Sequence, residues 1–156
     1  VYKSYFALAH GKISENLRIE ANMDLANDYD DVKMRMRICQ DGKIAVTEIL
    51  PLEYFADIDA TLVRAVPLTG RQHQIRLHLF HVEHKILGEP LYGLSRPQIE
   101  KILDKEMSES ERILMTGAPR LLLHSDEICF KFDGIEYRIK SKFDAQDEFY
   151  KLVKHG

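Results

Sequence analysis

The sequence predicts an α+β fold, with a mostly antiparallel mixed sheet and flanking helices, and three features carry this prediction. Apolar and polar residues alternate with period two in several short runs, as they do in half-buried strands. Two Asp-Gly pairs, Asp41-Gly42 and Asp133-Gly134, are typical of hairpin turns, because glycine accepts the positive φ that these turns require. After Gly70 the apolar spacing changes to that of a helix. Strands joined by hairpins, with helices between them, favour the α+β class.

The elements follow from these patterns in chain order. Strands are expected over residues 2–10, 33–38, 44–52, 60–68, 127–132 and 135–139. Helical spacing predicts a helix over residues 72 to about 84, a second over 99–107 inside a long connection, and a closing helix over 144–154. Residues 13–27 fit no single pattern, and residues 27–31 are expected to form an acidic loop.

Size and composition restrict the class of protein. A length of 156 residues suits one domain with one core, and 45% hydrophobic with 30% charged residues is typical of a globular chain. No run approaches the roughly 18 apolar residues that a membrane span needs. Cys39 and Cys129 have no CxxC partner, so free, buried thiols in a reducing cytoplasm are expected.

The first residues resemble a strand that is already under way. Val1 is not a methionine, and residues 1–8 have neither the charged nor the apolar segment of a signal peptide. We therefore expect the chain to be a truncation, a cleavage product or a fragment of a larger domain.

Charge is unevenly distributed along the chain. The net charge of −3 argues against a protein that coats nucleic acid nonspecifically. Between residues 64 and 85, however, Glu83 is the single acidic residue among several basic ones. A second basic cluster precedes Cys39. These basic residues are Arg64, Arg71, Arg76 and Lys85, then Lys33, Arg35 and Arg37. The distribution fits a basic cleft that holds a polyanion, and it equally fits solvated faces, which is the favoured interpretation for residues 33–37.

The segment around Gly70 combines features that suit an active site. Thr69-Gly70 forms a predicted turn, where glycine permits a close approach to a ligand, and a helix follows whose first turn presents free N–H groups. Arg71 lies at this entrance. Arg76 lies about 140° further around the helix at 100° per residue, at the edge of the apolar stripe. A partly buried arginine there needs an anionic partner.

Four ordered blocks resemble the RluA-like pseudouridine synthases. The specific block is Thr69-Gly70-Arg71-Gln72-His73-Gln74-Ile75-Arg76-Leu77-His78, which is similar to the family pattern T-G-R-x-H-Q-I-R-x-H. The supporting blocks are residues 86–93, the strand Leu123-His124-Ser125 to Phe130, and Lys3-Ser4-Tyr5-Phe6-Ala7-Leu8 with Gly11. The resemblance implies that residues 1–156 are the C-terminal portion of a pseudouridine synthase catalytic domain and fold as part of it.

The resemblance also implies roles for individual residues. Tyr5 matches the tyrosine that stacks on the target base, and Arg76 matches the arginine that ion-pairs with the catalytic aspartate. Thr69, Gly70, Arg71, His73 and Gln74 match residues that shape the cleft and its RNA-facing rim. Without the resemblance, Tyr5 would be interpreted as a core aromatic and Arg76 as part of a surface ion pair.

The departures from the family pattern are informative. Family members carry an H-R-L-D-x-x-T-S-G segment, whose aspartate is the nucleophile, before the Tyr5 strand, and no such segment occurs in this sequence. Arg76 is therefore expected to lack its carboxylate in this chain, and the chain is predicted to be inactive alone. Glu89 stands where the family has aspartate and Ser125 where it has alanine, and both substitutions look tolerable.

The implied activity isomerises uridine to pseudouridine in ribosomal or transfer RNA. The expected partners are this RNA and the missing N-terminal part of the protein, with no membrane and no cofactor, because the reaction is an isomerisation. A different class also fits, namely a non-catalytic RNA-binding or assembly module that reuses the fold.

The histidines of the predicted helix raise the question of a metal site. His73, His78, His81 and His84 include pairs at i,i+3 spacing, but no HExxH motif is present and only Glu83 lies nearby as a carboxylate. No metal is expected, and solvated or RNA-facing histidines are favoured.

Overall fold

A six-stranded sheet organises the molecule in a computed structural model that describes residues 1–26 and 35–154. The strand order is β2-β5-β6-β1-β7-β8, and all neighbours are antiparallel. The strands are β1 (Tyr2–His10), β2 (Leu17–Glu20), β5 (Val46–Phe55), β6 (Ala60–Pro67), β7 (Leu123–Phe132) and β8 (Ile135–Lys140). A separate two-stranded ribbon consists of β3 (Met23–Leu25) and β4 (Met36–Ile38). The predicted α+β class with a mostly antiparallel sheet is confirmed.

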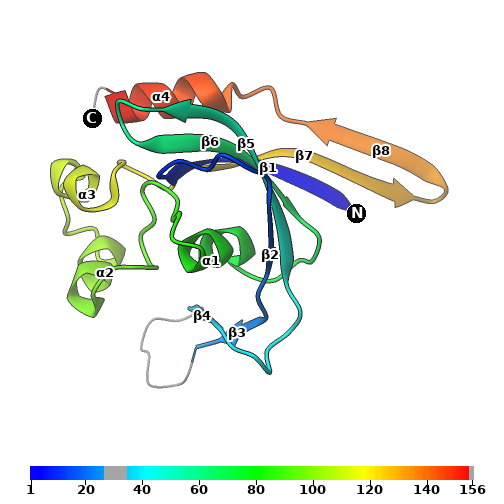
Figure 1. The fold of residues 1–156 in the computed structure, drawn as a ribbon, viewed down its shortest axis with the longest axis horizontal. Helices are drawn as coiled ribbons and strands as arrows, with labels where there is room; N and C mark the ends of the chain where they lie inside the picture. Colours follow the sequence, from blue (N-terminus) through cyan, green and yellow to red (C-terminus); the bar gives the residue numbers. More distant parts are fainter. Residues whose placement is uncertain (27–34, 155–156) are drawn as a thin grey trace.

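Helices cover both faces of this sheet, as Figure 1 shows. They are α1 (Gln74–His81), α2 (Arg96–Leu103), α3 (Glu109–Thr116) and α4 (Ala145–Lys154). Helix α1 lies between the sheet and the β3-β4 ribbon, whereas α4 lies on the opposite face of the sheet. Within the described residues, no helix has the length and apolar character needed to cross a membrane.

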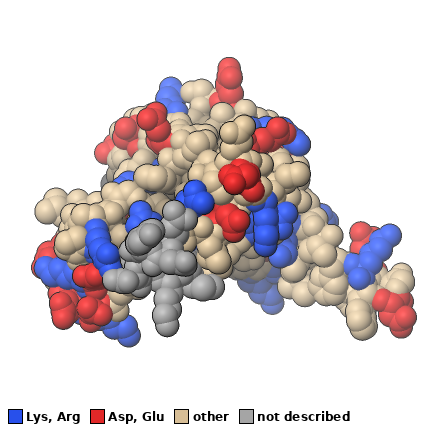
Figure 2. All heavy atoms as spheres, turned by 90° about the horizontal axis from the view of Figure 1, so that it is seen from below, with Lys and Arg blue, Asp and Glu red and all other residues tan. Residues whose placement is uncertain are grey.

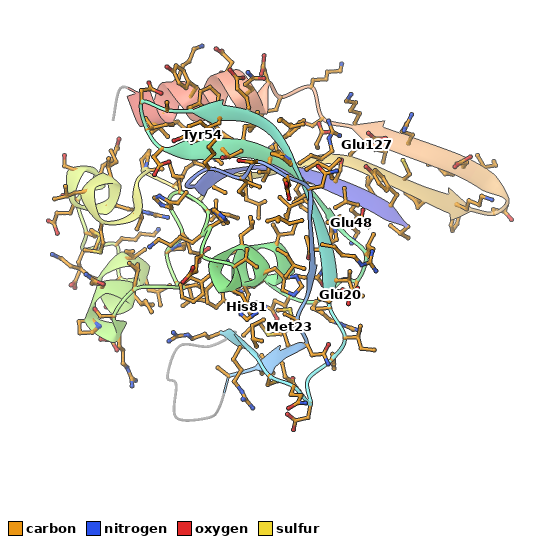
Figure 3. The ribbon with its side chains drawn as sticks, in the orientation of Figure 1. Glu20, Met23, Glu48, Tyr54, His81 and Glu127 are labelled. Atoms are coloured by element: carbon orange, nitrogen blue, oxygen red, sulfur yellow. The ribbon has the colours of Figure 1, made fainter. Side chains whose placement is uncertain are left out.

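The core is densest where α1 meets the central strands β1 and β6. Small buried residues on these strands, such as Ala7 and Ala65, leave room for Ile75 and Leu79 of α1. A second cluster lies on the other side of α1, where Leu77 packs with the fully buried Met23 of β3, labelled in Figure 3. Helix α1 is thus held between two apolar layers, which fixes the orientation of its first turn.

Several predicted elements form within a few residues of their expected bounds. Strands β1, β5 and β6 lie where the alternation placed them, and α4 closes the chain. The Asp133-Gly134 turn joins β7 to β8, with φ of 51° and 75° at its two residues. Helix α1 is shorter than the helix predicted over residues 72 to about 84. Helical geometry begins only at Gln74 and ends at His81. The predicted acidic loop over 27–31 and the start of the 33–38 strand lie outside the described residues.

The hairpin predicted at Asp41-Gly42 is wrong in its pairing. A turn does form, with the Gly42 N–H donating to Cys39 O at 3.0 Å, but β4 pairs with β3, and β5 pairs with β2 and β6. Glycine is needed there for a different reason, since a Cβ at Gly42 would lie 2.8 Å from the Met23 backbone. Strands β2 and β3, which pair with β5 and β4, lie within residues 13–27. Each of these strands is too short to define a hydrophobic period in the sequence.

The single helix predicted over 99–107 is also wrong, because two short helices occupy this connection. Ser95 caps α2 by accepting from Gln98 N, and Ser108 caps α3 by accepting from Glu111 N. Ser108, which directly follows the predicted helix, therefore begins a second one.

A buried histidine ties α1 to two other elements. The His78 ring is fully buried, with Nδ1 2.8 Å from Thr47 Oγ1 and Nε2 2.9 Å from the Ala21 carbonyl. A carbonyl only accepts, so Nε2 carries the proton and Nδ1 accepts from the Thr47 hydroxyl. This arrangement requires a neutral ring. Burial lowers the pKa of His78 from its ordinary 6.5, and nearby His81 lowers it further, against a raising effect of the Ala21 carbonyl.

We expect the pH dependence of stability to follow from this neutral ring. The unfolded chain binds a proton at His78 more readily than the folded chain does, so this contribution to stability is complete above pH 6.5 and is lost as pH falls below it. An NMR titration of the His78 ring should give a midpoint below 6.5, and His78→Gln should flatten the fall in unfolding free energy on the acid side. A midpoint at or above 6.5 would contradict the assignment.

Candidate active site

All seven residues that the sequence singled out line one cleft of about 420 Å³. They are Tyr5, Thr69, Gly70, Arg71, His73, Gln74 and Arg76, and they come from β1, the turn after β6 and the start of α1. The wall is completed by Val1, Lys3, Pro67, Leu68, Ile75 and Leu123. This volume lies within the range of small-molecule sites, roughly 300–1,000 Å³.

The turn between β6 and α1 is held by the buried Gln74 amide. Its Oε1 accepts from the Thr69 hydroxyl at 2.6 Å and from Arg71 N at 3.1 Å, and its Nε2 donates to Val46 O and Thr47 Oγ1 at 2.8 and 2.9 Å. Both ends of the amide are therefore engaged inside the protein. Gln74 acts on the cleft by fixing the turn to β5.

The left-handed backbone of this turn is at His73 and not at Gly70. His73 precedes α1 with φ 56° and ψ 20°, whereas Gly70 does not have a left-handed φ, and a Cβ there would meet nothing within 4 Å. The geometry of this chain does not itself require glycine at position 70. The space beside it is open to the cleft, so the expected close approach of a ligand stays a prediction.

Arg71 lies at the rim of the cleft. Its Nε donates to the Ile44 carbonyl at 2.9 Å, which ties the side chain to the segment before β5. The guanidinium is only partly buried, so it can still contact an anion at the rim.

Arg76 forms a two-point ion pair with Glu89. Its Nε donates to Glu89 Oε2 at 2.9 Å and its Nη2 to Oε1 at 2.6 Å. The Arg76 side chain is 15% exposed and that of Glu89 is 0% exposed. Bidentate charge-assisted pairs of this kind fix the guanidinium plane as well as its position.

The local backbone holds Glu89 in place. Leu91 N donates to Oε1 at 3.1 Å, and Tyr92 N approaches the same oxygen at 3.4 Å. Gly88 precedes it with φ 81°, and a Cβ at Gly88 would lie 1.8 Å from the Arg120 carbonyl. Only glycine fits this crossing, so the carboxylate is positioned by a turn that the surrounding chain determines.

Tyr92 links the ion pair to the rest of the cleft wall. The Arg76 guanidinium carbon lies 5.6 Å from the centre of its ring. The Tyr92 hydroxyl accepts from Met36 N at 3.1 Å and lies within hydrogen-bonding distance of His73 Nδ1, at 2.9 Å. Burial raises the pKa of Tyr92. Burial lowers the pKa of His73, and the positive charge of Arg76 lowers it further. Both groups are therefore neutral near pH 7.

The third guanidinium nitrogen of Arg76 is available to a ligand. Within residues 1–26 and 35–154, Nη1 makes no hydrogen bond, and Arg76 lines the cleft together with Tyr5. The edge formed by Nη1 and Nη2 can donate hydrogen bonds to a second carboxylate or to another anion. An aromatic wall and a fixed cation thus meet in one cleft.

Arg76 has a carboxylate partner within this chain, Glu89, that the sequence analysis did not expect, whereas the absence of the catalytic aspartate stays a prediction. Sequence reasoning treated Glu89 as a tolerable substitution and gave no role to Tyr92. A usable signal was present, since a partly buried arginine requires an anionic partner and Glu89 is the acid in the segment that ends the helix region.

The basic residues between 64 and 85 do not form one cleft. Arg64 lies on the α4 face of the sheet, where it contacts Asp126 at 3.5 Å and the Phe6 ring. Arg71 and Arg76 line the cleft, and Lys85 lines a separate groove. In Figure 2, Lys and Arg lie among Asp and Glu on the visible face. The predicted basic cleft is thus limited to two arginines and Lys3.

The separate groove is larger, at about 1,140 Å³, and runs between α1 and β4. Arg35, Arg37, His81 and Lys85 lie along it. It contains none of the seven predicted residues, and the network around Arg76 orders the smaller cleft, so the smaller cleft is the stronger candidate for chemistry. No group of three or more potential metal ligands occurs in the described part of the chain.

Comparison with known proteins identifies the family. The model of the RNA pseudouridylate synthase family matches residues 1–81. An uncharacterized RNA pseudouridine synthase of Helicobacter pylori is 37% identical over 142 residues, which are 90% of this chain and 45% of that protein. Ribosomal large subunit pseudouridine synthase C of Haemophilus influenzae is 32% identical over 148 residues, which are 94% of this chain and 42% of that protein.

A solved structure shares the fold of this chain. Human RNA pseudouridylate synthase domain containing 1 superposes with a TM-score of 0.67 at 20% identity, over 99% of this chain and 66% of that one. The chain spans less than half the length of these curated relatives. By the family match and by the block that lines its cleft, the chain belongs to the RNA pseudouridylate synthase family.

Proposed function

We propose that this chain is the C-terminal portion of a pseudouridine synthase catalytic domain and isomerises uridine in ribosomal or transfer RNA. An N-terminal part of the same protein supplies the catalytic aspartate, and the chain alone does not turn over. The reaction takes place in the cytoplasm and uses no cofactor. The observation that carries the proposal is the cleft that Tyr5 lines together with Arg76, an arginine already fixed by Glu89.

The chemistry assigns a task to each part of this cleft. Uridine leaves its stack at a cost of a few kcal/mol, and the flat Tyr5 ring offers a stacking surface to the extruded base. The aspartate then acts at the ribose, either by adding to C1′ or by removing a ribose proton, so it must be ionised. Arg76 favours that ionised form, because a fixed positive charge nearby lowers the pKa of a carboxyl group.

The remaining residues shape and position the cleft in this proposal. Arg71 and Lys3 contact phosphate at the rim, while Thr69 and Gln74 hold the turn. Glu89 is a positioning residue, since it meets Arg76 on the Nε side and leaves the Nη1 side for the aspartate.

Tritium release from RNA that carries 5-tritiated uridine tests the proposal, because C5 loses its hydrogen when it joins C1′. We expect release by the intact parent protein on transcripts of ribosomal or transfer RNA, and none by residues 1–156 alone. In the parent, Arg76→Lys should slow release by about 10²-fold or more, as loss of a fixed stabilising donor does. Arg18→Lys, at an exposed arginine on β2, is the matched control and should leave the rate unchanged.

A parent protein that binds RNA but releases no tritium from any transcript would overturn this proposal. That result would favour the alternative of a non-catalytic RNA-binding or assembly module. Equal rates of tritium release for Arg76→Lys and Arg18→Lys would instead show that Arg76 has no role in the reaction.

The Glu89 carboxylate should matter for both stability and turnover. Glu89→Gln leaves Arg76 largely buried beside a neutral amide, so we expect the free energy of unfolding of this chain to fall by about 3–5 kcal/mol in urea titrations. In the parent protein, kcat should fall while KM changes little, because the guanidinium loses its orientation. Glu20→Gln, in an exposed pair with Arg18, should change neither quantity. Loss of stability with an unchanged kcat would mean that Glu89 only supports the fold.

A further inference from the structure

The long connection before β7 lies outside the cleft but contacts the turn that carries Glu89. Residues 94–120 form this connection, with α2 and α3 in it, and none of them lines the cleft. Figure 1 shows α2 and α3 at the end of the molecule opposite the β7-β8 hairpin. Helix α3 is nevertheless bonded to Gly88, the residue directly before Glu89.

Both peptide groups of Gly88 are hydrogen-bonded to α3. Its N–H donates to the Thr116 carbonyl at 2.8 Å, and its carbonyl accepts from Arg112 Nη2 at 3.2 Å. Gly88 is buried, so Arg112 satisfies a carbonyl group that water does not reach. On the other side, Leu87 N donates to the Leu8 carbonyl of β1 at 2.8 Å. The turn before Glu89 is therefore fixed to the sheet by one residue and to α3 by the next.

Arg112 also acts on Glu89 through its charge. The guanidinium is half-buried, which lowers the pKa of Arg112, and the negative charge of Glu89 opposes this effect. The carboxylate that pairs with Arg76 thus lies in the field of a second arginine. The two arginines bond different parts of one turn, because Arg76 binds the carboxylate and Arg112 binds the carbonyl one residue before it.

Stability alone does not account for a guanidinium at position 112. Its Nε is buried and has no hydrogen-bond partner within residues 1–26 and 35–154. An unpaired buried donor lowers stability, and an apolar side chain of similar length would avoid this cost. An unsatisfied group of this kind in a folded protein calls for an explanation beyond packing.

We propose that Arg112 is a positioning residue for the candidate active site. It holds the Gly88 carbonyl and places a positive charge beside Glu89, which keeps the Glu89 carboxylate aimed at Nε and Nη2 of Arg76. The inference rests on the proposed function in one respect, namely that Arg76 takes part in the reaction. Arg112 lies outside the cleft, so it touches no substrate and acts only through Gly88 and Glu89.

Hydrogen exchange of the Arg76 Nε–H, measured by NMR in residues 1–156, tests the positioning. In Arg112→Met we expect exchange with solvent to be about tenfold faster, or more, because this N–H leaves Glu89 Oε2 more often. Arg18→Met, at an exposed arginine on β2, is the matched control and should leave the exchange unchanged. Ile19→Val, in the core on β2, should lower the free energy of unfolding without speeding this local exchange.

Turnover by the parent protein tests the consequence for the reaction. Arg112→Met should slow tritium release by about tenfold with little change in KM, because a displaced guanidinium weakens the reaction step and not RNA binding. Arg112→Lys keeps the positive charge and a donor for the Gly88 carbonyl, so it should recover most of the rate. A general loss of stability would not give this pattern.

Unchanged exchange at Arg76 in Arg112→Met would overturn the proposal. So would an unchanged kcat in an active parent, or a rise in KM alone, which would place Arg112 in substrate binding. If Arg112→Met does not fold, Arg112→Gln takes its place and should show the same faster exchange. A parent protein that releases no tritium contradicts the proposed function alone, because the exchange of the Arg76 Nε–H does not depend on turnover.

Discussion

The cleft depends on one buried ion pair, between Arg76 and Glu89. Arg76 lies on the first turn of a helix held between two apolar layers. Glu89 follows Gly88, where the Arg120 carbonyl leaves no room for a side chain. The pair is stable in this place because both oxygens of the carboxylate and two nitrogens of the guanidinium are hydrogen-bonded, which offsets the cost of burying charge. Tyr92 then joins the pair to His73 and to β4, so the orientation of the cleft wall follows from it.

Much of the fold could be predicted from local pattern, where the pattern was long enough. Strand β1 and the Asp133-Gly134 hairpin were found because alternation and turn chemistry agree over many residues. Strands β2 and β3 were missed because each has only three or four residues, too few to define a period. The Asp41-Gly42 turn misled for the same reason: a turn specifies a change of direction and not which strand becomes the neighbour, and here β4 pairs with β3.

The seven residues predicted for the site share one cleft, and their roles there stay predictions, whereas their individual contacts were less predictable. All seven residues line the cleft because a single turn and its helix carry six of them. Their individual tasks depend on tertiary partners. Gln74 is engaged with β5, the left-handed residue is His73, and the partner of Arg76 lies 13 residues along the chain at a position set by packing. Charge runs were the weakest guide, since alternate residues of a strand such as β6 face opposite layers and Arg64 faces away from the cleft.

The ion pair orients the candidate site in advance. Glu89 fixes one edge of the Arg76 guanidinium, while Nη1 makes no hydrogen bond within residues 1–26 and 35–154. A crystal structure of the intact parent protein measures this most directly. We expect the Arg76–Glu89 pair to be retained, with an aspartate oxygen from the N-terminal part within hydrogen-bonding distance of Arg76 Nη1. A structure in which Glu89 has left Arg76, or in which no carboxylate from that part reaches Nη1, would contradict the account.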